Sequence, residues 1–267
     1  TPLLTGLAIG IYGLTQALLQ IPFGMLSDRI GRKPVIVGGL VLFAIGSVVA
    51  AMSESIAGVI VGRALQGSGA IAAAVMALAA DLTRDEQRTK AMAIIGMSIG
   101  LSFALALVLG PVLNSWIGVP GIFWLTALLA LVGIALTLFV VPNPHKMQFH
   151  RDAEVEPTQF VKVLKEKELL RLDFGIFALH LCLTALFLAY PLALRDQGLA
   201  SDHHWQVYLP VMLVAMLTMV PFVIMAESKH RMKQVFIGGI AALGIAGLGL
   251  YHYYTSLVGL VVALWLF

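Results

Sequence analysis

The chain has 267 residues, of which 60% are hydrophobic and only 12% are charged, and its formal net charge is +3. An ordinary soluble domain carries about a quarter charged residues, so this composition leaves too little polar surface for a water-soluble fold and indicates a multi-pass membrane protein. The positive charges lie between apolar segments, where such charges orient a membrane protein, so we expect no nucleic-acid partner. The single cysteine, Cys182, lies in an apolar run, so we expect no disulfide and no metal site.

Eight apolar segments are long enough to cross a membrane as helices, because about 20 residues span a hydrocarbon layer of about 30 Å. They cover residues 4–26, 34–53, 56–80, 90–114, 118–141, 173–194, 205–226 and 234–253, and a ninth begins near Ser256 and is cut off. The apolar runs are continuous rather than alternating, and lipid requires internal backbone hydrogen bonding, so helices are favoured over barrel strands. The chain starts without Met and stops inside an apolar run, and we expect it to be a fragment of a longer protein.

Fifteen of the 17 lysines and arginines fall on one side of the predicted membrane. They lie in four loops, at residues 29–33, 84–90, 146–171 and 229–233. The opposite side holds only Arg195, and Arg63 lies within a segment. By the positive-inside rule, the four basic loops are cytoplasmic.

The longest connection, residues 143–172, contains a stretch with apolar residues at roughly helical spacing. The lysines Lys162, Lys165 and Lys167 lie opposite the apolar positions, which are Phe160, Val163, Leu164 and Leu170. This pattern predicts an amphipathic helix at the membrane surface, and a linker without such a helix is the alternative.

Two similar stretches lie 199 residues apart, PFGMLSDRIGR at residues 22–32 and PFVIMAESKHR at residues 221–231. Each joins the end of an apolar segment to a basic loop, so the repeat preserves orientation and indicates two parallel six-helix halves. The parent protein is then expected to have twelve helices, of which this chain holds the second to the ninth and part of the tenth. We expect an N-terminal bundle at residues 1–142 (helices 2–6), a cytoplasmic linker at 143–172, and helices 7–9 with part of helix 10 at 173–267.

The turn GMLSDRIGRKP, residues 24–34, gathers four charges in six residues. Its glycines allow a tight turn and close approach of helices. Asp28 is within reach of Arg32, and Asp81, at the same side of the membrane, is a second candidate partner. The pattern resembles the signature between helices 2 and 3 of the major facilitator superfamily, and the resemblance covers the whole chain. The matching residues are Gly24, Leu26, Asp28, Arg29, Gly31, Arg32 and Lys33.

This resemblance implies a fold of two pseudo-symmetric six-helix bundles, incomplete here, with eight full transmembrane helices and part of a ninth. It also implies that the charged turn is a conformational latch, which holds the outward-facing state shut on the cytoplasmic side. The implied latch residues are Gly24, Asp28, Arg29, Gly31, Arg32, Lys33 and Asp81. Simple positive-inside anchoring is the alternative, and it explains Arg29 and Lys33 but not an aspartate between glycines.

The stretch VGRALQGSGAIAAA, residues 61–74, places Arg63 and Gln66 one turn apart inside a membrane segment. An arginine at this depth costs several kcal/mol unless it faces water or an acceptor, so we take it as functional. It resembles the helix-4 motif R-x-x-Q-G of the superfamily, whose arginine is associated with proton coupling. A purely structural role for the arginine is the alternative.

The stretch GLSFALALVLGP, residues 100–111, resembles the helix-5 motif of antiporters in this superfamily. The residues carried over are Gly100, Gly110 and Pro111, which are expected to allow close helix contact and a local kink. VLNSW follows where the motif usually has further glycines, so the match is incomplete.

No acidic residue lies in the middle of a predicted segment, so a proton carrier within this chain is not a carboxylate. His180 is the imidazole nearest the middle of a segment, and its ordinary pKa of about 6.5 suits a proton relay. A histidine satisfied by a neighbouring helix is the alternative.

Two further sets of residues are candidates for lining a cavity. The first is a polar stripe on the first segment, and the second is an adaptable apolar group around Tyr190. Helix packing is the alternative for the polar stripe, and packed or lipid-facing positions, which are commoner for methionine, are the alternative for the apolar group. The candidates are Tyr12, Gln16, Gln20, Tyr190, Met212, Met216 and Met219.

These features predict a secondary active transporter that works by alternating access between two bundles. The drug-antiporter branch of the superfamily, which the motifs resemble, implies proton-driven efflux of small amphiphilic or cationic drug-like molecules. Proton-coupled symport of a nutrient or metabolite is the alternative. The chain has no His-Glu-x-x-His, Gly-x-Ser-x-Gly or Walker pattern, so we expect neither an enzyme nor an ATP-driven pump. We expect a monomer in the bacterial inner membrane, with no cofactor, whose partners are a small-molecule substrate, protons and lipid.

Overall fold

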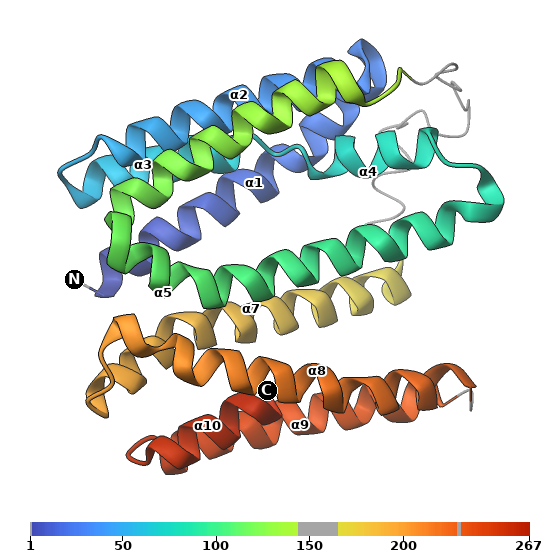
Figure 1. Cartoon of the computed structure of the whole chain (residues 1–267). Helices are drawn as coiled ribbons and strands as arrows, with labels where there is room; N and C mark the ends of the chain where they lie inside the picture. The colour runs from blue at the N-terminus through green and yellow to red at the C-terminus, as the bar shows by residue number, and fades with distance from the viewer. Residues whose placement is uncertain (1, 144–164, 229–230) are drawn as a thin grey trace. The chain divides into compact units, whose positions relative to one another are not determined.

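The computed structural model describes residues 2–143, 165–228 and 231–267, and in these ranges it consists of helices joined by turns (Figure 1). The first part forms α1 (Pro2–Ile30), α2 (Arg32–Ala51), α3 (Ile56–Ser68), α4 (Ala72–Asp81) and the 3₁₀ turn η1 (Asp85–Gln87). It continues with α5 (Arg88–Ala135) and the π-helical turn η2 (Leu136–Val140). The last part forms α7 (Lys167–Asp196), the 3₁₀ turn η4 (Ser201–His203), α8 (Trp205–Ser228), α9 (Met232–Tyr253) and α10 (Leu257–Leu266).

Within the described ranges, 7 helical runs are long and apolar enough to cross a membrane. One of them, Lys90–Val140, has 51 residues and contains two of the predicted segments. These two meet at Gly118, whose φ of 67° and ψ of 176° lie outside the helical region and in a region that favours glycine. With the shorter apolar helix α10, the runs account for the eight predicted segments and the ninth that is cut off. The prediction of an all-α membrane protein is confirmed.

The described residues belong to two compact units. Unit 1 comprises residues 1–100 and 116–170, and unit 2 comprises residues 101–115 and 171–267. The predicted regions 1–142, 143–172 and 173–267 remain predictions. Of the apolar positions of the expected amphipathic helix, Phe160, Val163 and Leu164 lie outside the described residues, whereas Leu170 lies within α7.

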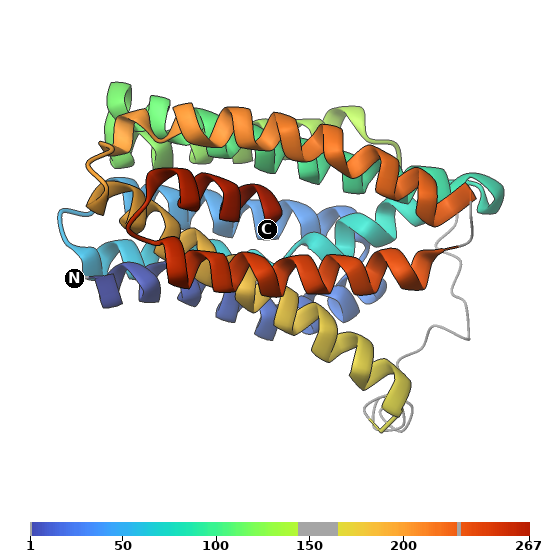
Figure 2. The same ribbon diagram turned by 90° about the horizontal axis from the view of Figure 1, so that it is seen from below.

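Glycines bring the helix backbones of unit 1 together. In this unit α1, α2 and α3 lie side by side (Figures 1 and 2). A Cβ added to Gly46 of α2 would overlap the carbonyl oxygen of Gly62 in α3, and a Cβ on Gly62 would overlap that of Gly46. A Cβ on Gly67 of α3 would overlap the carbonyl oxygen of Tyr12 in α1. Small residues at helix crossings are the usual means of close packing in membranes, where water does not drive helices together.

The predicted continuous helix at residues 56–80 is interrupted after Ser68, which corrects the expectation. The reason is a contact between two glycines, because Gly69 lies against the backbone of Gly39 in α2. There the Gly69 N–H donates to Gln66 O (3.1 Å) and the Ala70 N–H donates to Gly67 O (3.2 Å), in the tighter i to i+3 pattern. The chain resumes as α4, and the two helices together make one apolar run long enough to cross the membrane.

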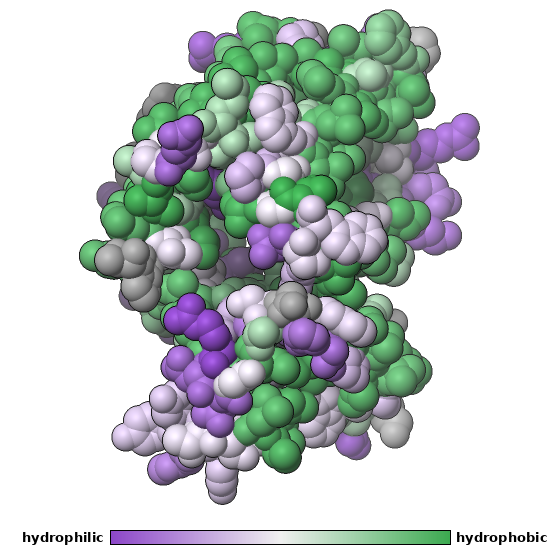
Figure 3. Space-filling model, turned by 60° about the vertical axis from the view of Figure 1, so that its left-hand side comes forward, coloured by the Kyte–Doolittle hydropathy of each residue, from purple (hydrophilic) through white to green (hydrophobic). Residues whose placement is uncertain are grey.

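Each unit has a small buried apolar cluster. In unit 1, Val35 and Ile36 of α2 pack on Ala74 and Leu78 of α4. In unit 2 the cluster joins α7, α8 and α10 through Leu186, Tyr190, Leu194, Val207, Tyr208, Val211 and Leu260. Many other large apolar side chains are exposed, and they cover broad areas of the face in Figure 3. Such surfaces suit contact with lipid tails.

Gly39→Ala is expected to destabilise the protein by about 1–3 kcal/mol, the usual range for overpacking a close contact. Its Cβ would overlap Ile71 and the Gly69 carbonyl oxygen, whereas a Cβ on the adjacent Gly38 meets no atom within 4 Å. Thermal unfolding of the purified protein in detergent measures the effect, with Gly38→Ala as the matched control. Equal unfolding temperatures for the two variants would contradict this packing.

Candidate functional site

The charged turn is built at the junction of α1 and α2. Gly31 separates the two helices and has a φ of 102°, a conformation that residues with a Cβ rarely adopt. Gly24, about two turns earlier, lies against α4, where a Cβ added to it would be 3.4 Å from the Cβ of Ala73. The two glycines therefore fix the direction of the chain and the spacing of the helices around the turn.

Arg32 is the centre of the ionic contacts at this turn. Its guanidinium forms an ion pair with Asp28 of α1 and donates from Nε to Oδ2 of Asp81, at the end of α4, over 3.1 Å. It also donates to the hydroxyl of Ser27 over 2.7 Å. The side chain of Arg32 is only 17% exposed, so these three acceptors replace most of its water. One side chain thus ties together α1, α2 and α4.

These three charges occupy unfavourable positions relative to the helix dipoles. Asp28 and Asp81 lie in the last turns of α1 and α4, where the dipole disfavours an anion, and Arg32 begins α2, where it disfavours a cation. Each misplacement costs roughly 0.3–1 kcal/mol at an exposed helix end. The stability of the separate helices therefore does not explain the cluster, but their mutual attachment does.

The other residues of the charged turn have different surroundings. Lys33 donates its ammonium proton to the backbone carbonyl of Val141, just after η2. Arg29 is exposed. Ser27, which the sequence pattern did not single out, is fully buried and donates to Gly24 O over 2.7 Å while it accepts from Arg32. A small polar residue directly before the aspartate of the motif is the only sequence signal for it.

Arg63 lies within α3 and is held by polar neighbours without an ion pair among the described residues. Its Nε donates to Ala8 O of α1 over 3.3 Å, and one terminal nitrogen donates to Oε1 of Gln66 over 3.0 Å. Its guanidinium carbon lies 4.3 Å from the centre of the Tyr12 ring. A cation over an aromatic face gains about 2 kcal/mol when both are shielded from water.

A hydrogen-bond chain continues from Gln66 to two residues that the sequence did not single out. Gln66 Nε2 donates to the hydroxyl of Ser47 in α2 over 2.7 Å, and the Thr126 hydroxyl of α5 lies 3.2 Å from the same oxygen. Ser47 is fully buried and Gln66 is 2% exposed. A lone serine and a lone threonine in apolar helices give no pattern, so sequence reasoning had no signal for either.

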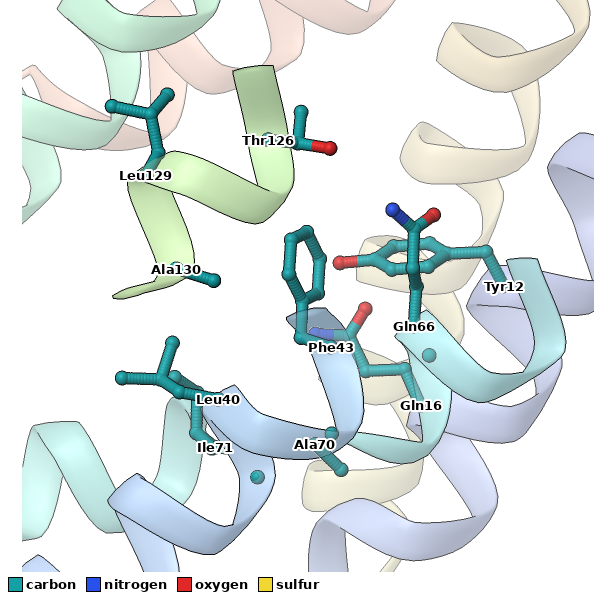
Figure 4. A pocket seen from close by; sticks show the side chains of 13 residues that line it. Tyr12, Gln16, Leu40, Phe43, Gln66, Ala70, Ile71, Thr126, Leu129 and Ala130 are labelled. Carbon is teal, nitrogen blue, oxygen red and sulfur yellow. The ribbon is translucent and has the colours of Figure 1, made fainter. Parts of the chain in front are cut away.

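A cavity of about 350 Å³ in unit 1 adjoins this chain (Figure 4). Tyr12, Gln16, Phe43 and Gln66 form one side of it, and Thr126 of α5 faces them from the other, with Leu129 and Ala130. Of the predicted polar stripe, Tyr12 and Gln16 line the cavity. Gln20 does not, and its buried Oε1 has no hydrogen-bond partner among the described residues.

A second cavity, of about 230 Å³, lies within unit 2 and is almost wholly apolar. Tyr190, Met212, Met216 and Met219 are among the residues that line it, together with Tyr208. The rings of Tyr190 and Tyr208 are 6.0 Å apart. The structure thus places the predicted apolar set around one space, separate from the residues of the first cavity.

The remaining predicted residues lie apart from these features. His180 is exposed on α7, and its Nδ1 lies 2.9 Å from Ile176 O of the same helix. A Cβ added at Gly100 or Gly110 would meet no described atom within 4 Å, and the non-helical residue in α5 is Gly118 rather than Pro111. The described residues include no group of three or more His, Cys, Asp or Glu placed to hold a metal ion. The assignments of His180, Gly100, Gly110 and Pro111 stay predictions.

The comparison with known families agrees with the fold and with the charged turn. The profile of the Major Facilitator Superfamily matches residues 1–267. The chain belongs to this superfamily. The family and the names of its relatives point to a multi-pass transport protein rather than an enzyme.

Individual relatives in the superfamily are similar over different lengths. The chain is 55% identical over 264 residues to the inner membrane transport protein YajR of Escherichia coli K12, which covers 99% of this chain and 58% of YajR. It is 32% identical over 150 residues to the multidrug resistance protein MdtL of Shewanella oneidensis, covering 55% of this chain and 38% of MdtL. The crystal structure of a D-xylose–proton symporter superposes with a TM-score of 0.66 at 17% identity, over 98% of this chain and 67% of that one, which shows a shared fold.

Arg32→Gln is expected to lower the free energy of unfolding by about 1–2 kcal/mol, because it leaves two carboxylates of partly buried ion pairs without their cation. Arg29→Gln, in an exposed position of the same turn, is the matched control and is expected to change stability by less than about 0.5 kcal/mol. Thermal unfolding of the purified protein compares the two. A loss as large for Arg29→Gln as for Arg32→Gln would show that only net charge matters at this turn.

Proposed function

We propose that the protein of which this chain is part is a proton-coupled efflux antiporter of small amphiphilic molecules. The observation that carries the proposal is Arg63, a cation inside a membrane helix whose described contacts are all neutral and which lies beside a cavity. Intramembrane charges without a fixed counter-ion are costly, and they are found where ions or protons act. The multidrug resistance name of the relative MdtL supports the efflux direction.

Proton coupling through Arg63 requires that its surroundings respond to a proton or a substrate. The guanidinium stays charged, so its role is to repel or release a proton held nearby and not to carry it. Gln66 and Tyr12, which hold Arg63 from two sides, also line the cavity. A molecule in the cavity can therefore contact the same two side chains that contact the guanidinium of Arg63. His180 stays a candidate proton carrier.

The charged turn supplies the conformational part of the mechanism. Arg32 joins α1, α2 and α4 through Asp28 and Asp81, and breaking both ion pairs removes the ionic attachment between the three helix ends. Alternating access requires a contact of this kind, which is stable in one state and broken in the other. We propose that the charged turn is the latch that holds the outward-facing state shut. We further propose that the protein is a monomer of the inner membrane, with its basic loops on the cytoplasmic side.

The cavity in unit 1 favours an uncharged amphiphile as substrate. Its walls combine apolar side chains with Tyr12, Gln16, Gln66 and Thr126, and none of the described residues that line it is an acid or a base. A small number of hydrogen-bonding groups in an apolar cavity suits a ligand that is mostly hydrophobic. The same polar groups suit a hydroxyl-rich metabolite, so proton-coupled symport of a nutrient or metabolite is the second candidate.

Transport of chloramphenicol, an uncharged amphiphile, into proteoliposomes tests the direction of coupling. The chain spans only 58% of the length of its relative YajR. The assay therefore uses the longest natural protein that includes these residues. Uptake driven by an inside-acid gradient is expected, and Arg63→Ala is expected to reduce it roughly tenfold or more, about 1.4 kcal/mol. Asp28→Asn is expected to reduce it severalfold through the latch. Arg195→Ala, at the end of α7, is the control for loss of an arginine.

Each other outcome of that assay has a definite meaning. Uptake that follows an inside-alkaline gradient would establish symport and overturn the efflux assignment. Uptake that ignores the pH gradient in the wild type would overturn proton coupling. Equal uptake by Arg63→Ala and Arg195→Ala would remove Arg63 from the mechanism.

Charge selectivity gives a second test of the same site. A cation about 8 Å from the guanidinium of Arg63 is repelled by about 2 kcal/mol at an effective dielectric of about 20, which is roughly 30-fold in affinity. Chloramphenicol is therefore expected to be transported with a higher kcat/KM than tetraphenylphosphonium, with the membrane potential clamped. Arg63→Gln is expected to narrow that difference. A wild type that prefers the cation would place the substrate away from the cavity in unit 1.

A further inference from the structure

Three helices of unit 1 are linked by one continuous chain of hydrogen bonds. It runs from Thr126 of α5 through Ser47 of α2 and Gln66 of α3 to the guanidinium of Arg63. Thr126 and Gln66 line the cavity, whereas Ser47, in the middle of the chain, is fully buried. The hydrogen-bond chain thus includes two residues that a ligand in the cavity can touch, Thr126 and Gln66. It ends at Arg63, which has no ion-pair partner among the described residues.

Ser47 uses all of its hydrogen-bonding capacity in this position. Its hydroxyl donates to Phe43 O over 2.8 Å, and its oxygen accepts from Gln66 Nε2 and from Thr126. A hydroxyl has one proton and two lone pairs, so these partners use its full capacity when the Thr126 proton points at Ser47. Specific hydrogen bonds, and not helix packing alone, therefore hold the Ser47 side chain in one orientation.

Ser47 also decides which way the amide of Gln66 points. Because the amide nitrogen donates to Ser47, the amide oxygen faces Arg63 and accepts from it over 3.0 Å. The reverse orientation would point two donors at a guanidinium, which has only donors. Removing the serine hydroxyl removes the reason for this orientation, and with it a neutralising contact of Arg63.

Thr126 is the adjustable member of the chain. Its single hydroxyl proton has two acceptors within reach, Phe123 O at 2.8 Å and Ser47 Oγ at 3.2 Å, and it can be given fully to only one at a time. Its oxygen also lies in the cavity wall, so a ligand with a polar group competes for the same hydroxyl. A ligand at Thr126 therefore changes the hydrogen bonding of Ser47.

The backbone around Ser47 is held rigidly enough to transmit such a change. The preceding residue, Gly46, lies against Gly62 of α3 so closely that neither position has room for a Cβ. Side chains that must act in a fixed geometry are best placed on packed helices of this kind.

We infer that Ser47 is a positioning residue of the coupling mechanism, which transmits occupancy of the cavity at Thr126 to Arg63 through the amide of Gln66. The inference rests on the proposed function, since it requires transport coupled to protons at Arg63. It adds two residues to that mechanism. Ser47 does not touch the substrate, and Thr126 does.

The test compares Ser47→Ala and Thr126→Val with wild type in proteoliposomes, with chloramphenicol as probe under a fixed inside-acid gradient. The decisive quantity is the accumulation ratio at steady state, which reports how tightly substrate and proton are coupled. Both variants are expected to lower it by roughly fivefold, the effect of one buried hydrogen bond. Thr126→Ser keeps the hydroxyl and is expected to restore the wild-type ratio. Ser98→Ala is the control, because Ser98 is an exposed serine whose hydroxyl bonds only its own helix, at Ile94 O.

A merely structural role for Ser47 would change the rate or the amount of folded protein but leave the accumulation ratio at the wild-type value. That result, with a coupled wild type, overturns the inference alone. If Ser47→Ala does not fold, Thr126→Val decides, since valine matches threonine in shape. If the wild type itself shows no proton-driven accumulation, the proposed function fails and the inference fails with it.

Discussion

The constraint on which unit 1 depends is the presence of a guanidinium inside a membrane helix. Arg63 needs acceptors, and the described residues offer no carboxylate to it, so a carbonyl of α1, an amide of its own helix and an aromatic ring share the task. Each acceptor must itself be held in place, which draws α2 and α5 into the same network through Ser47 and Thr126. The close packing at Gly46 and Gly62 is what brings these groups within hydrogen-bonding distance. Helix packing and hydrogen bonding therefore depend on each other here. Small residues let the helices approach closely, and the close approach lets polar groups form hydrogen bonds.

The charged turn follows a different physical logic. Its ion pairs are partly exposed, and Asp28, Arg32 and Asp81 are each placed against the dipole of their own helix. Such an arrangement adds little to the stability of any one helix, but it makes the ends of α1, α2 and α4 depend on a single arginine. An attachment of moderate strength suits the proposed latch, because a latch must open in each conformational cycle. The turn thus attaches the helix ends of unit 1, whereas the buried Arg63 organises the hydrogen bonds within it.

The sequence was sufficient for features that depend on composition or on short spacing. Apolar length predicted the membrane helices, and the spacing of Asp28 to Arg32 and of Arg63 to Gln66 predicted contacts one helical turn apart. The partnership of Arg32 with Asp81, 49 residues away, was anticipated because both lie at the same side of the predicted membrane. Ser47, Thr126 and the interruption after Ser68 were not predictable in this way. They depend on which residue of one helix faces which residue of another, and a single serine or glycine in an apolar helix carries no sign of what it will meet.

The interruption between α3 and α4 has a consequence for recognition in the cavity. Gly67, Gly69, Ala70 and Ile71 belong both to this break and to the cavity wall. Where a helix stops, some of its N–H and C=O groups leave the regular pattern, and within a membrane such backbone is tolerated only against protein or a space that holds water or ligand. Residues of the break thus contribute to the wall, and the course of their main chain does not depend on the side chains of the other lining residues. Exchange of Tyr12, Gln16 or Thr126 would change the side chains that a ligand meets, whereas the path of this backbone strip depends on the contact of Gly69 with Gly39.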